Sequence, residues 1–500
     1  MNITTVSLLP NIILIPELFL GLSIVYLVFH CLFFGHHHKN KFFLFVKSLI
    51  FLISLTSWMT FLILVNQSFG CLLISNFSNS YISDNLSNFS KRVICLLSFL
   101  FFLFIEKFVS TQKINSFEYY IIFMFGILGT FLVCSANDLL AAYLSIELQG
   151  LSFYLLTAFS KRSTYSVENG LKYFILGSFA SGLFLYGSSM LYGLFGTLNF
   201  SDFRDLVEDS AGSNAYCLDI LQYPLILILA SLLFKLAIGP FHSWLPDIYE
   251  SSPFNSTFFF AVVPKLSVLI LFIKILNYSF SDIIFYYTDA LIFSAICSVV
   301  IGSFGGLEQR KFKSLLAYSS ISHMGYLLIV FSLPNKEVFQ FGLSYIIIYM
   351  ISSLCFWMIL TLLRLKNPYF KKQNSDLTDL VLLSKSNLGL CINLTILLFS
   401  TAGFPPLIGF FVKINLFFAN IETSYYLVGL FSIFCSVAST FYYIRIVKIL
   451  YFEEVGIGKL YYPIKSHIII ILSLLIYLLA FLFVKPDLLL FISDKMIFRN

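Results

Sequence analysis

Long apolar runs, separated by short polar segments, dominate the chain. Fourteen of them are long enough to cross a bilayer as helices, since a hydrocarbon core about 30 Å thick takes about 20 apolar residues. The pattern therefore predicts an all-α polytopic membrane protein without a sizeable soluble domain. The predicted crossings are 11–34, 42–65, 92–110, 117–134, 137–157, 167–196, 223–240, 256–277, 286–305, 314–332, 338–363, 387–418, 424–447 and 466–485.

The composition supports this class. Of the 500 residues, 59% are hydrophobic and 11% are charged, whereas soluble globular proteins are about 25% charged. So few charges cannot cover a soluble surface, and the apolar content excludes a disordered chain. The net charge of +6 comes without a basic tract, so we expect no nucleic-acid partner. The 9 cysteines show no CxxC pair, so we expect neither a disulfide framework nor a metal site.

Basic residues are divided unequally between the two ends of the predicted helices. Of the 31 lysines and arginines, 18 follow odd-numbered crossings and 7 follow even-numbered ones. Because basic loops stay on the side where the chain is made, this asymmetry predicts an even number of crossings, with both termini on the opposite side. The other six basic residues lie inside apolar runs: Lys47, Lys172, Lys235, Lys265, Lys274 and Lys413.

Some of these charges are predicted to reach the membrane interface. Lys47 and Lys274 lie near the ends of their apolar runs, where a long side chain can extend to water. Lys172 lies a few residues inside its run, and both the same extension and an electrostatic effect on Glu147 remain open for it. Glu17 opens the first crossing, and we expect it at the interface as well.

Four ionisable residues lie deeper, namely Lys235, Lys265, Lys413 and Glu147. A charge at the bilayer centre costs at least about 2.5–3.5 kcal/mol. Burial disfavours an ammonium group and a nearby carboxylate favours it, so a buried lysine beside a movable carboxylate can hold or release a proton near neutral pH. We interpret the four residues as an acid–base row that carries protons or ions. Static salt bridges that fix helix packing are the alternative.

Two glycine–proline interruptions break the helical pattern, each beside a deep lysine. Proline removes a backbone donor, and a broken backbone persists in a membrane only inside protein or a wet cavity. The interruptions fall in crossings seven and twelve, which predicts two inverted five-helix repeats made of crossings 4–8 and 9–13. The interrupting residues are Gly239, Pro240, Gly403, Pro405 and Pro406.

The predicted organisation has four parts. Three helices occupy residues 1–110, the first repeat occupies 117–277, the second occupies 286–447, and a final helix and tail occupy 448–500. The boundaries follow the polar segments between the apolar runs.

The remaining chemistry points to proton handling without a cofactor. His242 and His323 are candidates for proton relay because the unperturbed imidazole pKa is about 6.5, although simple hydrogen bonding is the other interpretation. None of the 7 histidines pairs with another at the depth that haem ligation needs, and no cysteine quartet could hold an iron–sulfur cluster. A glycine-rich nucleotide fingerprint is also missing. We therefore expect no metal or cofactor in this chain, and electron chemistry only in partners.

Several motifs, in order along the chain, resemble one family. Together they are similar to the antiporter-like membrane subunits of respiratory complex I, NADH:ubiquinone oxidoreductase, a family that includes Mrp-type cation/proton antiporters. The sequence of the motif at 234–250 is most similar to the second membrane subunit of the complex. The motifs are 144–149, 154–156, 168–182, 234–250, 264–265, 317–326 and 403–406.

The resemblance implies fourteen helices, with helices seven and twelve broken, and one proton channel. It implies that Glu147 modulates Lys235, that protons pass through Lys265 towards Lys413, and that Lys172 is the functional lysine of helix six. It further implies FMN and iron–sulfur clusters in partner subunits, sibling antiporter-like subunits as neighbours, and membrane lipids such as cardiolipin.

The resemblance and the composition together predict a location. Abundant Phe, Tyr, Ile, Asn and Lys, with 60 Phe and 29 Tyr, are typical of an AT-rich organelle genome. We therefore expect the mitochondrial inner membrane, with both termini facing the intermembrane space. A plastid homologue that serves plastoquinone, an Mrp-type or stand-alone antiporter, and a static membrane scaffold are the alternatives.

Overall fold

In a computed structural model, the described residues fall into two compact units. The first comprises Met1–Leu236, Ser251–Tyr286 and Met496–Asn500, and the second comprises Ala237–Glu250 and Tyr287–Lys495. The structure describes residues 14–35, 42–67, 74–105, 116–161, 163–211, 215–333, 336–363, 376–381, 383–453 and 466–496.

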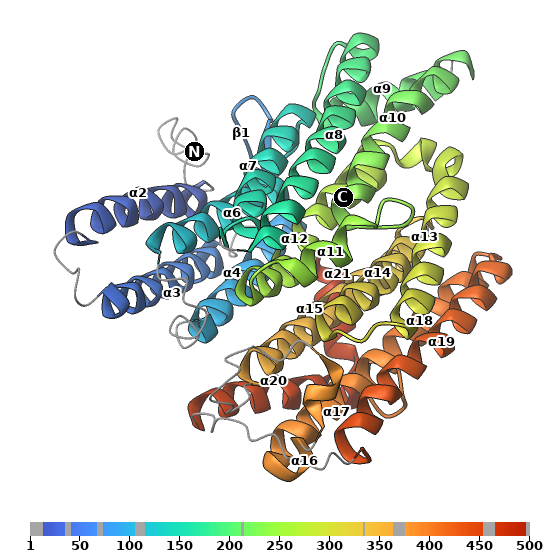
Figure 1. The fold of residues 1–500 in the computed structure, drawn as a ribbon. Helices are drawn as coiled ribbons and strands as arrows, with labels where there is room; N and C mark the ends of the chain where they lie inside the picture. Colours follow the sequence, from blue (N-terminus) through green and yellow to red (C-terminus); the bar gives the residue numbers. More distant parts are fainter. Residues whose placement is uncertain are drawn as a thin grey trace. The chain divides into compact units, whose positions relative to one another are not determined.

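The first unit is a helical bundle with one small hairpin (Figure 1). Helix α12 is apolar on all sides and is buried completely, because α4, α6, α7 and α10 pack around it. The helices are α2 (Ile15–Gly35), α3 (Phe42–Asn66), α4 (Asn85–Ile105), α6 (Phe117–Ser135), α7 (Leu139–Thr157), α8 (Thr164–Phe195), α9 (Phe200–Ala211), α10 (Ala215–Leu236) and α12 (Phe254–Ile273). Strands β1 (Ile74–Asn76) and β2 (Tyr81–Ser83) pair antiparallel, and a π-helical turn, η2 (Lys274–Ser279), and a 3-10 turn, η3 (Ser281–Ile283), continue α12.

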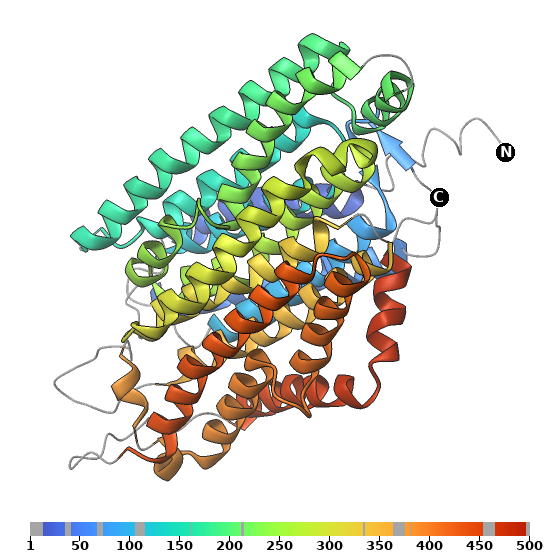
Figure 2. The ribbon, with the colours of Figure 1, turned by 90° about the vertical axis from the view of Figure 1, so that its right-hand side faces the viewer.

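The second unit is also helical. Its central helix, α14, is almost entirely buried, and α18 packs against α14, α15 and α19. The elements are α11 (Trp244–Ser251), α13 (Ile284–Leu307), α14 (Phe312–Phe331), α15 (Lys336–Leu362), η4 (Leu377–Leu380), α16 (Leu383–Ser386), α17 (Leu388–Ala402), α18 (Ile408–Glu422), α19 (Tyr426–Tyr451), α20 (Ser466–Val484) and α21 (Asp487–Met496). Figure 2 shows the sharp turn between α20 and α21, which are bent by 94°.

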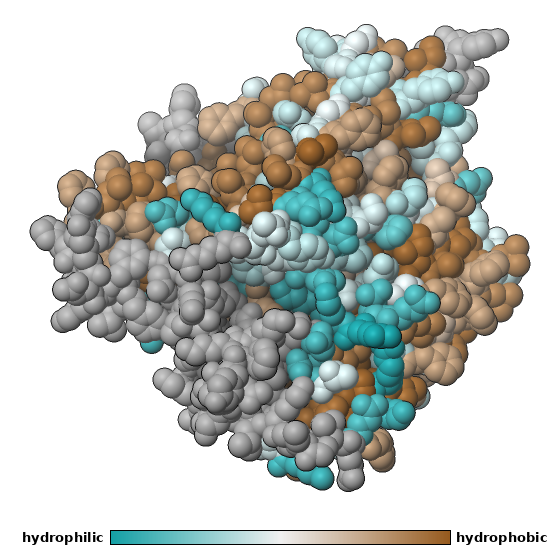
Figure 3. Space-filling model, in the orientation of Figure 1, coloured by the Kyte–Doolittle hydropathy of each residue, from teal (hydrophilic) through white to brown (hydrophobic). Residues whose placement is uncertain are grey.

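The helices bear out the predicted class. Among the described residues, 11 helices are long and apolar enough to cross a membrane, or up to 12 if the bent pair α20–α21 forms one span. Two shorter apolar helices, Ile220–Leu236 and Leu388–Ala402, end at the predicted interruptions. The all-α polytopic prediction is therefore confirmed, whereas the number fourteen and the two inverted repeats stay predictions. Figure 3 shows broad apolar areas on the face in view, with hydrophilic residues gathered in smaller areas.

One helix begins earlier than its apolar run. Helix α4 starts at Asn85, whereas the sequence predicts a crossing from residue 92. Polar groups at its start are satisfied within the protein, since Ser87 Oγ accepts from the Asp84 backbone N–H at 2.8 Å and Lys91 is buried in an ion pair. An apolar run predicts only the part of a helix that consists of apolar residues. The first turns of α4 are polar, so the run does not include them.

Loops that follow alternate crossings meet each other inside each unit. In the first unit, Asn137 donates to the Asn79 and Ser80 carbonyls at 2.9 Å, which joins the loops after crossings two and four. In the second, the Leu377 N–H donates to the Arg310 carbonyl at 3.0 Å, which joins the loops after crossings nine and eleven. Both contacts agree with helices that alternate in direction. The chain termini lie outside the described residues.

Candidate functional site

Lys235 lies in the last turn of α10, just before the first interruption. Its Nζ donates a hydrogen bond to Tyr154 Oη at 3.1 Å and lies 5.6 Å from the centroid of the Tyr154 ring. Glu147 and Tyr154 share a face of α7, seven residues apart, and Glu147 acts electrostatically on both Tyr154 and Lys235. Within the described residues no ion pair joins Glu147 to Lys235. The partner in contact with this lysine is thus a neutral phenol.

Two glycines make room for this phenol. A Cβ at Gly177 of α8 would collide with the Tyr154 hydroxyl, and one at Gly150 of α7 would lie 3.2 Å from it and 3.4 Å from Lys235 Nζ. Tyr154 also packs edge-on against Tyr173, with ring centroids 4.7 Å apart. Close approach of α7, α8 and α10 therefore fixes the hydroxyl that Lys235 binds. Sequence reasoning did not identify Tyr154 as this partner, although its spacing of seven from Glu147 is visible in the chain.

One carboxylate oxygen of Glu147 has no hydrogen-bond donor among the described residues. The carboxylate lies on a half-buried position of α7, between the exposed side chains of Leu144 and Leu151. Its Oε1 is buried and accepts no hydrogen bond from the described part of the chain. A carboxylate oxygen that is buried without a donor is costly, so this position of Glu147 needs a physical explanation.

Lys265 lies on the fully buried helix α12, directly after Pro264, and is 6% exposed. Because proline lacks an N–H, the helix leaves one upstream carbonyl without its usual bond. Two residues later, Ser267 Oγ donates to the Pro264 carbonyl at 2.8 Å and lies 3.5 Å from Gln149 Oε1. The lysine-bearing segment of α12 therefore lies against the Glu147-bearing segment of α7.

Lys172 is exposed, unlike Lys235, Lys265 and Lys413. Its side chain is 53% exposed, and its Nζ lies 3.1 Å from Glu168 Oε1, one turn earlier on α8. The described contacts do not bring it to Glu147. The structure thus places Lys172 in an exposed ion pair, and its role in proton translocation stays a prediction.

Lys413 lies on α18, beside the second interruption. Its Nζ donates to the Ala402 carbonyl at 2.9 Å, one of the carbonyls that the end of α17 leaves without a helical partner. Gly403 has φ +85°, in the left-handed region, and a Cβ there would lie 2.9 Å from Lys413 Cδ. The interruption therefore supplies both an acceptor for the ammonium group and the space for its side chain.

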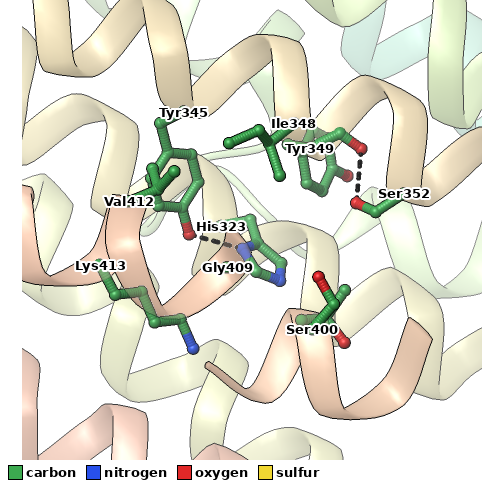
Figure 4. Close-up of a pocket in the computed structure, with 10 residues that line it drawn as sticks. His323, Tyr345, Ile348, Tyr349, Ser352, Ser400, Gly409, Val412 and Lys413 are labelled. Carbon is green, nitrogen blue, oxygen red and sulfur yellow. Dashed lines mark hydrogen bonds between the residues drawn. The ribbon is translucent and has the colours of Figure 1, made fainter. Parts of the chain in front are cut away.

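A cavity of about 20 Å³ adjoins this lysine (Figure 4). That volume holds about one water molecule. His323, Tyr345, Tyr349, Thr401 and Lys413 are among its lining residues. His323 Nδ1 and Tyr345 Oη are 2.6 Å apart and point toward each other. Four of these five side chains, all except Thr401, are titratable. The cavity can therefore connect His323 with Lys413.

His242 does not join this group. It lies in the first interruption, where its Nδ1 is 3.2 Å from the Pro240 carbonyl, and the described lining of the cavity does not include it. The structure puts Gly239 and Pro240 between α10 and α11, and a Cβ at Gly239 would lie 2.9 Å from the Ser298 backbone nitrogen. Pro405 and Pro406 likewise lie between α17 and α18.

Two further lysines are buried against carboxylates. Lys91 Nζ lies 2.5 Å from Glu17 Oε1, and Lys274 Nζ lies 3.1 Å from Asp84 Oδ2. All four side chains are at most 8% exposed. Lys91, Lys274 and Glu17 also act electrostatically on the thiol of Cys134, so both ion pairs lie within electrostatic range of this thiol.

These ion pairs correct the expectation for Lys274. Its side chain does not extend to the interface, because it finds an oppositely charged partner inside the bundle. Glu17 is likewise buried in an ion pair. Sequence reasoning also missed Asp84 and Lys91. Their signal is weak, because isolated polar residues beside an apolar run are typical of interfaces.

The chain matches the family described as NADH:quinone oxidoreductase/Mrp antiporter, transmembrane, over residues 136–439. The chain belongs to this family. The family resemblance drawn from the motifs is thereby confirmed, and the matched segment contains Glu147, Lys172, Lys235, Lys265 and Lys413.

Relatives within the family match most of the chain. "NADH-quinone oxidoreductase subunit N" of Pelagibacter ubique is 37% identical over 442 residues, which are 88% of this chain and 89% of that protein. "NADH-ubiquinone oxidoreductase chain 2" of Marchantia polymorpha is 35% identical over 490 residues, which are 97% of each chain.

Chains in solved structures share the fold. One chain of respiratory complex I from Thermus thermophilus has a TM-score of 0.77 at 23% identity, covering 95% of this chain and 98% of that one. One chain of the Mrp complex from Dietzia has a TM-score of 0.78 at 16% identity, covering 96% of each. At these identities the likeness concerns the fold alone.

Proposed function

We propose that this family member is a proton-translocating membrane subunit of an NADH:quinone oxidoreductase of the complex I type. Its site in the cell would be the mitochondrial inner membrane, with both termini in the intermembrane space. The names of its relatives support the complex, and the 18-to-7 distribution of basic residues supports the orientation.

One observation carries the proton-translocating role. Lys235 and Lys413, each beside a helix interruption, bind a tyrosine hydroxyl and a backbone carbonyl rather than a carboxylate. A lysine with a neutral partner can lose its proton without leaving an unpaired buried charge. Such a lysine can therefore alternate between its two protonation states.

In the mechanism that we propose, Glu147 controls Lys235 and protons pass from Lys235 through Lys265 to Lys413. The ammonium of Lys235 is stabilised when Glu147 is charged and near, and is released when the carboxylate moves away. At Lys413, the Ala402 carbonyl holds the ammonium while the cavity offers His323 as the next proton acceptor. Lys172 is assigned no step, because it lies in an exposed pair with Glu168.

Electron transfer would take place in other subunits. The sequence offers no haem ligand pair, iron–sulfur quartet or nucleotide fingerprint, so FMN and iron–sulfur clusters belong to partner subunits in this proposal. Sibling antiporter-like subunits would be neighbours within the membrane. Exposed apolar side chains on α7 and α8, among them Leu140, Leu155, Ile175 and Phe179, provide surface for such neighbours or for lipids such as cardiolipin.

An Mrp-type antiporter is the second candidate, because the Mrp chain has the same fold at a TM-score of 0.78. The relatives at 35–37% identity are instead oxidoreductase subunits. Purification from native membranes separates the two functions. Co-purification with flavin and iron–sulfur subunits supports the oxidoreductase, and an assembly without them supports the antiporter.

The proton role is tested by Lys265→Met and Lys413→Met in the assembled complex. We expect both variants to lose proton pumping and quinone-dependent NADH oxidation, while NADH oxidation by an artificial acceptor survives. Lys448→Met, at an exposed position of α19, is the matched control. Wild-type pumping and quinone reduction in a fully assembled Lys265→Met complex would show that the buried lysines are structural.

A further inference from the structure

The cavity beside Lys413 has a polar lining residue that the proposed path does not use. Ser400, in the last turn of α17, lines this cavity together with His323 and Lys413 (Figure 4). Its side chain is 3% exposed, and its Oγ has no hydrogen-bond partner among the described residues. A buried hydroxyl without a partner costs free energy, so this one needs a physical explanation.

Ser400 differs in this respect from the hydroxyl residues around it. A serine or threonine in a helix can donate to the carbonyl three or four residues earlier. Thr401, the next residue, donates in this way to the Leu398 carbonyl at 3.1 Å. Ser352, which also lines the cavity, donates to the Tyr349 carbonyl at 3.0 Å. Helix carbonyls therefore satisfy both of these neighbours, and the hydroxyl of Ser400 is left to the cavity.

The cavity has the space and the polar groups that one water molecule needs. A Cβ at Gly409 of α18 would collide with the Ser400 carbonyl and lie 3.5 Å from Ser400 Oγ, so this glycine keeps the space beside the hydroxyl open. The cavity of about 20 Å³ is larger than the roughly 10–15 Å³ that a water molecule requires. A buried water also needs about two to four polar partners. Ser400, Lys413 and His323 can supply them, since an ammonium group has three donors and the Ala402 carbonyl takes one.

Tyr345 determines which nitrogen of His323 takes part. Tyr345 Oη lies 2.6 Å from Nδ1 of His323, and Figure 4 shows the other ring nitrogen, Nε2, on the side away from Tyr345. When Nδ1 carries the proton of the neutral ring and donates it to Tyr345, Nε2 can accept another proton. Proton exchange between His323 and the cavity therefore requires Nε2.

We propose that Ser400 positions a water molecule through which Lys413 passes its proton to His323. The inference rests on the proposed function and adds a positioning residue to the last step of that path. Ser400 Oγ and Lys413 Nζ donate to the water oxygen, and the water donates to Nε2 of His323. An N–H bond of Lys413 breaks as the water takes up that proton, and the water releases one of its own hydrogens to Nε2, where a new N–H bond forms. Lys413 becomes a neutral amine, His323 becomes an imidazolium, and the water is regenerated.

The test removes the hydroxyl and leaves every charge in place. In the assembled complex, we expect Ser400→Ala to pump protons about two- to tenfold more slowly, as the loss of one neutral hydrogen bond predicts. Ser400→Thr keeps a hydroxyl and should pump faster than Ser400→Ala. Ser344→Ala on α15 is the matched control and should pump normally, because the buried Ser344 donates to the Phe341 carbonyl at 2.7 Å. NADH oxidation by an artificial acceptor should be unchanged in all three variants.

Density maps of the wild-type and Ser400→Ala complexes, at a resolution that shows ordered water, measure the binding directly. We expect a water molecule within hydrogen-bond distance of Ser400 Oγ and Lys413 Nζ in the wild type. In Ser400→Ala this water should be lost or displaced. A side chain that only fills space would not change the position of the water.

Three results would overturn the role of Ser400. They are wild-type pumping in Ser400→Ala, a Ser400→Thr complex that assembles normally and is as slow as Ser400→Ala, and a wild-type map without a water at Ser400 Oγ. If Ser400→Ala does not assemble, the wild-type map decides. Lys265→Met in the same assay keeps the two hypotheses apart. A slow Lys265→Met with a normal Ser400→Ala removes the role of Ser400 and leaves the proposed function, whereas normal rates in both remove the function itself.

Discussion

Two kinds of buried lysine occur in this protein. At the hairpin end of the first unit, Lys91 and Lys274 each lie within 3.1 Å of a buried carboxylate. Lys235, in contrast, donates a hydrogen bond to a phenol at 3.1 Å, and Lys413 donates one to a backbone carbonyl at 2.9 Å. A carboxylate at contact distance keeps an ammonium group charged and fixed, whereas a neutral acceptor permits both protonation states. The partner, rather than depth alone, therefore separates structural lysines from those suited to carry protons.

The largest effect is expected at the ion-paired end. Lys274→Met leaves Asp84 buried without its cation, which should destabilise the subunit by about 3–5 kcal/mol. Thermal unfolding of the purified complex, or the yield of assembled complex, measures the loss. The double variant Lys274→Met/Asp84→Asn should recover most of it, because no uncompensated charge remains. Equal instability of the single and double variants would contradict the ion-pair assignment.

An intermediate effect is expected for Tyr154→Phe, which removes only the hydroxyl that Lys235 binds. A hydrogen bond to a charged group contributes about 1.5–3 kcal/mol, so pumping should fall roughly tenfold or more. Assembly should change little, since the ring still packs against Tyr173. Tyr143→Phe on the same helix is the control. Normal pumping by Tyr154→Phe would mean that the phenol does not position Lys235.

A smaller effect on stability is expected at the second interruption. Gly403→Ala places a Cβ 2.9 Å from Lys413 Cδ at a φ of +85°, so strain of about 1–3 kcal/mol should displace the lysine from the Ala402 carbonyl. Slower pumping with nearly normal assembly is the expected result. Gly389→Ala, in α17, is the matched control, because no atom lies within 4 Å of its added Cβ. Similar behaviour of the two variants would contradict the role of the interruption.

The smallest effect is expected for Lys172→Met. Its exposed pair with Glu168 is one turn apart on α8, and such pairs contribute about 0.3–0.5 kcal/mol. Stability should be nearly unchanged, and pumping should fall far less than in Lys265→Met. A large loss of pumping would support the functional role that the family resemblance implies for this lysine. It would place Lys172 among the lysines that carry protons.

The membrane class and the two interruptions could be predicted from the order of residues alone. Apolar periodicity and glycine–proline segments are local properties, so the order of residues along the chain sufficed to place Lys235 and Lys413 beside a break. The motifs also sufficed to identify the family. The early start of α4 escaped this reasoning, because its polar first turns are satisfied by groups elsewhere in the bundle.

The partner of each buried charge, in contrast, depends on how the helices pack. Asp84 and Lys274 are distant in the chain, and nothing in either apolar run encodes their contact, so Lys274 resembled a lysine at the interface. The exposure of Lys172 and the burial of Lys313 could not be read from the sequence either, since each lies near a helix end where both are possible. A run of apolar residues predicts that a helix enters the membrane. It does not predict which face of the helix is buried or which other helices pack against that face.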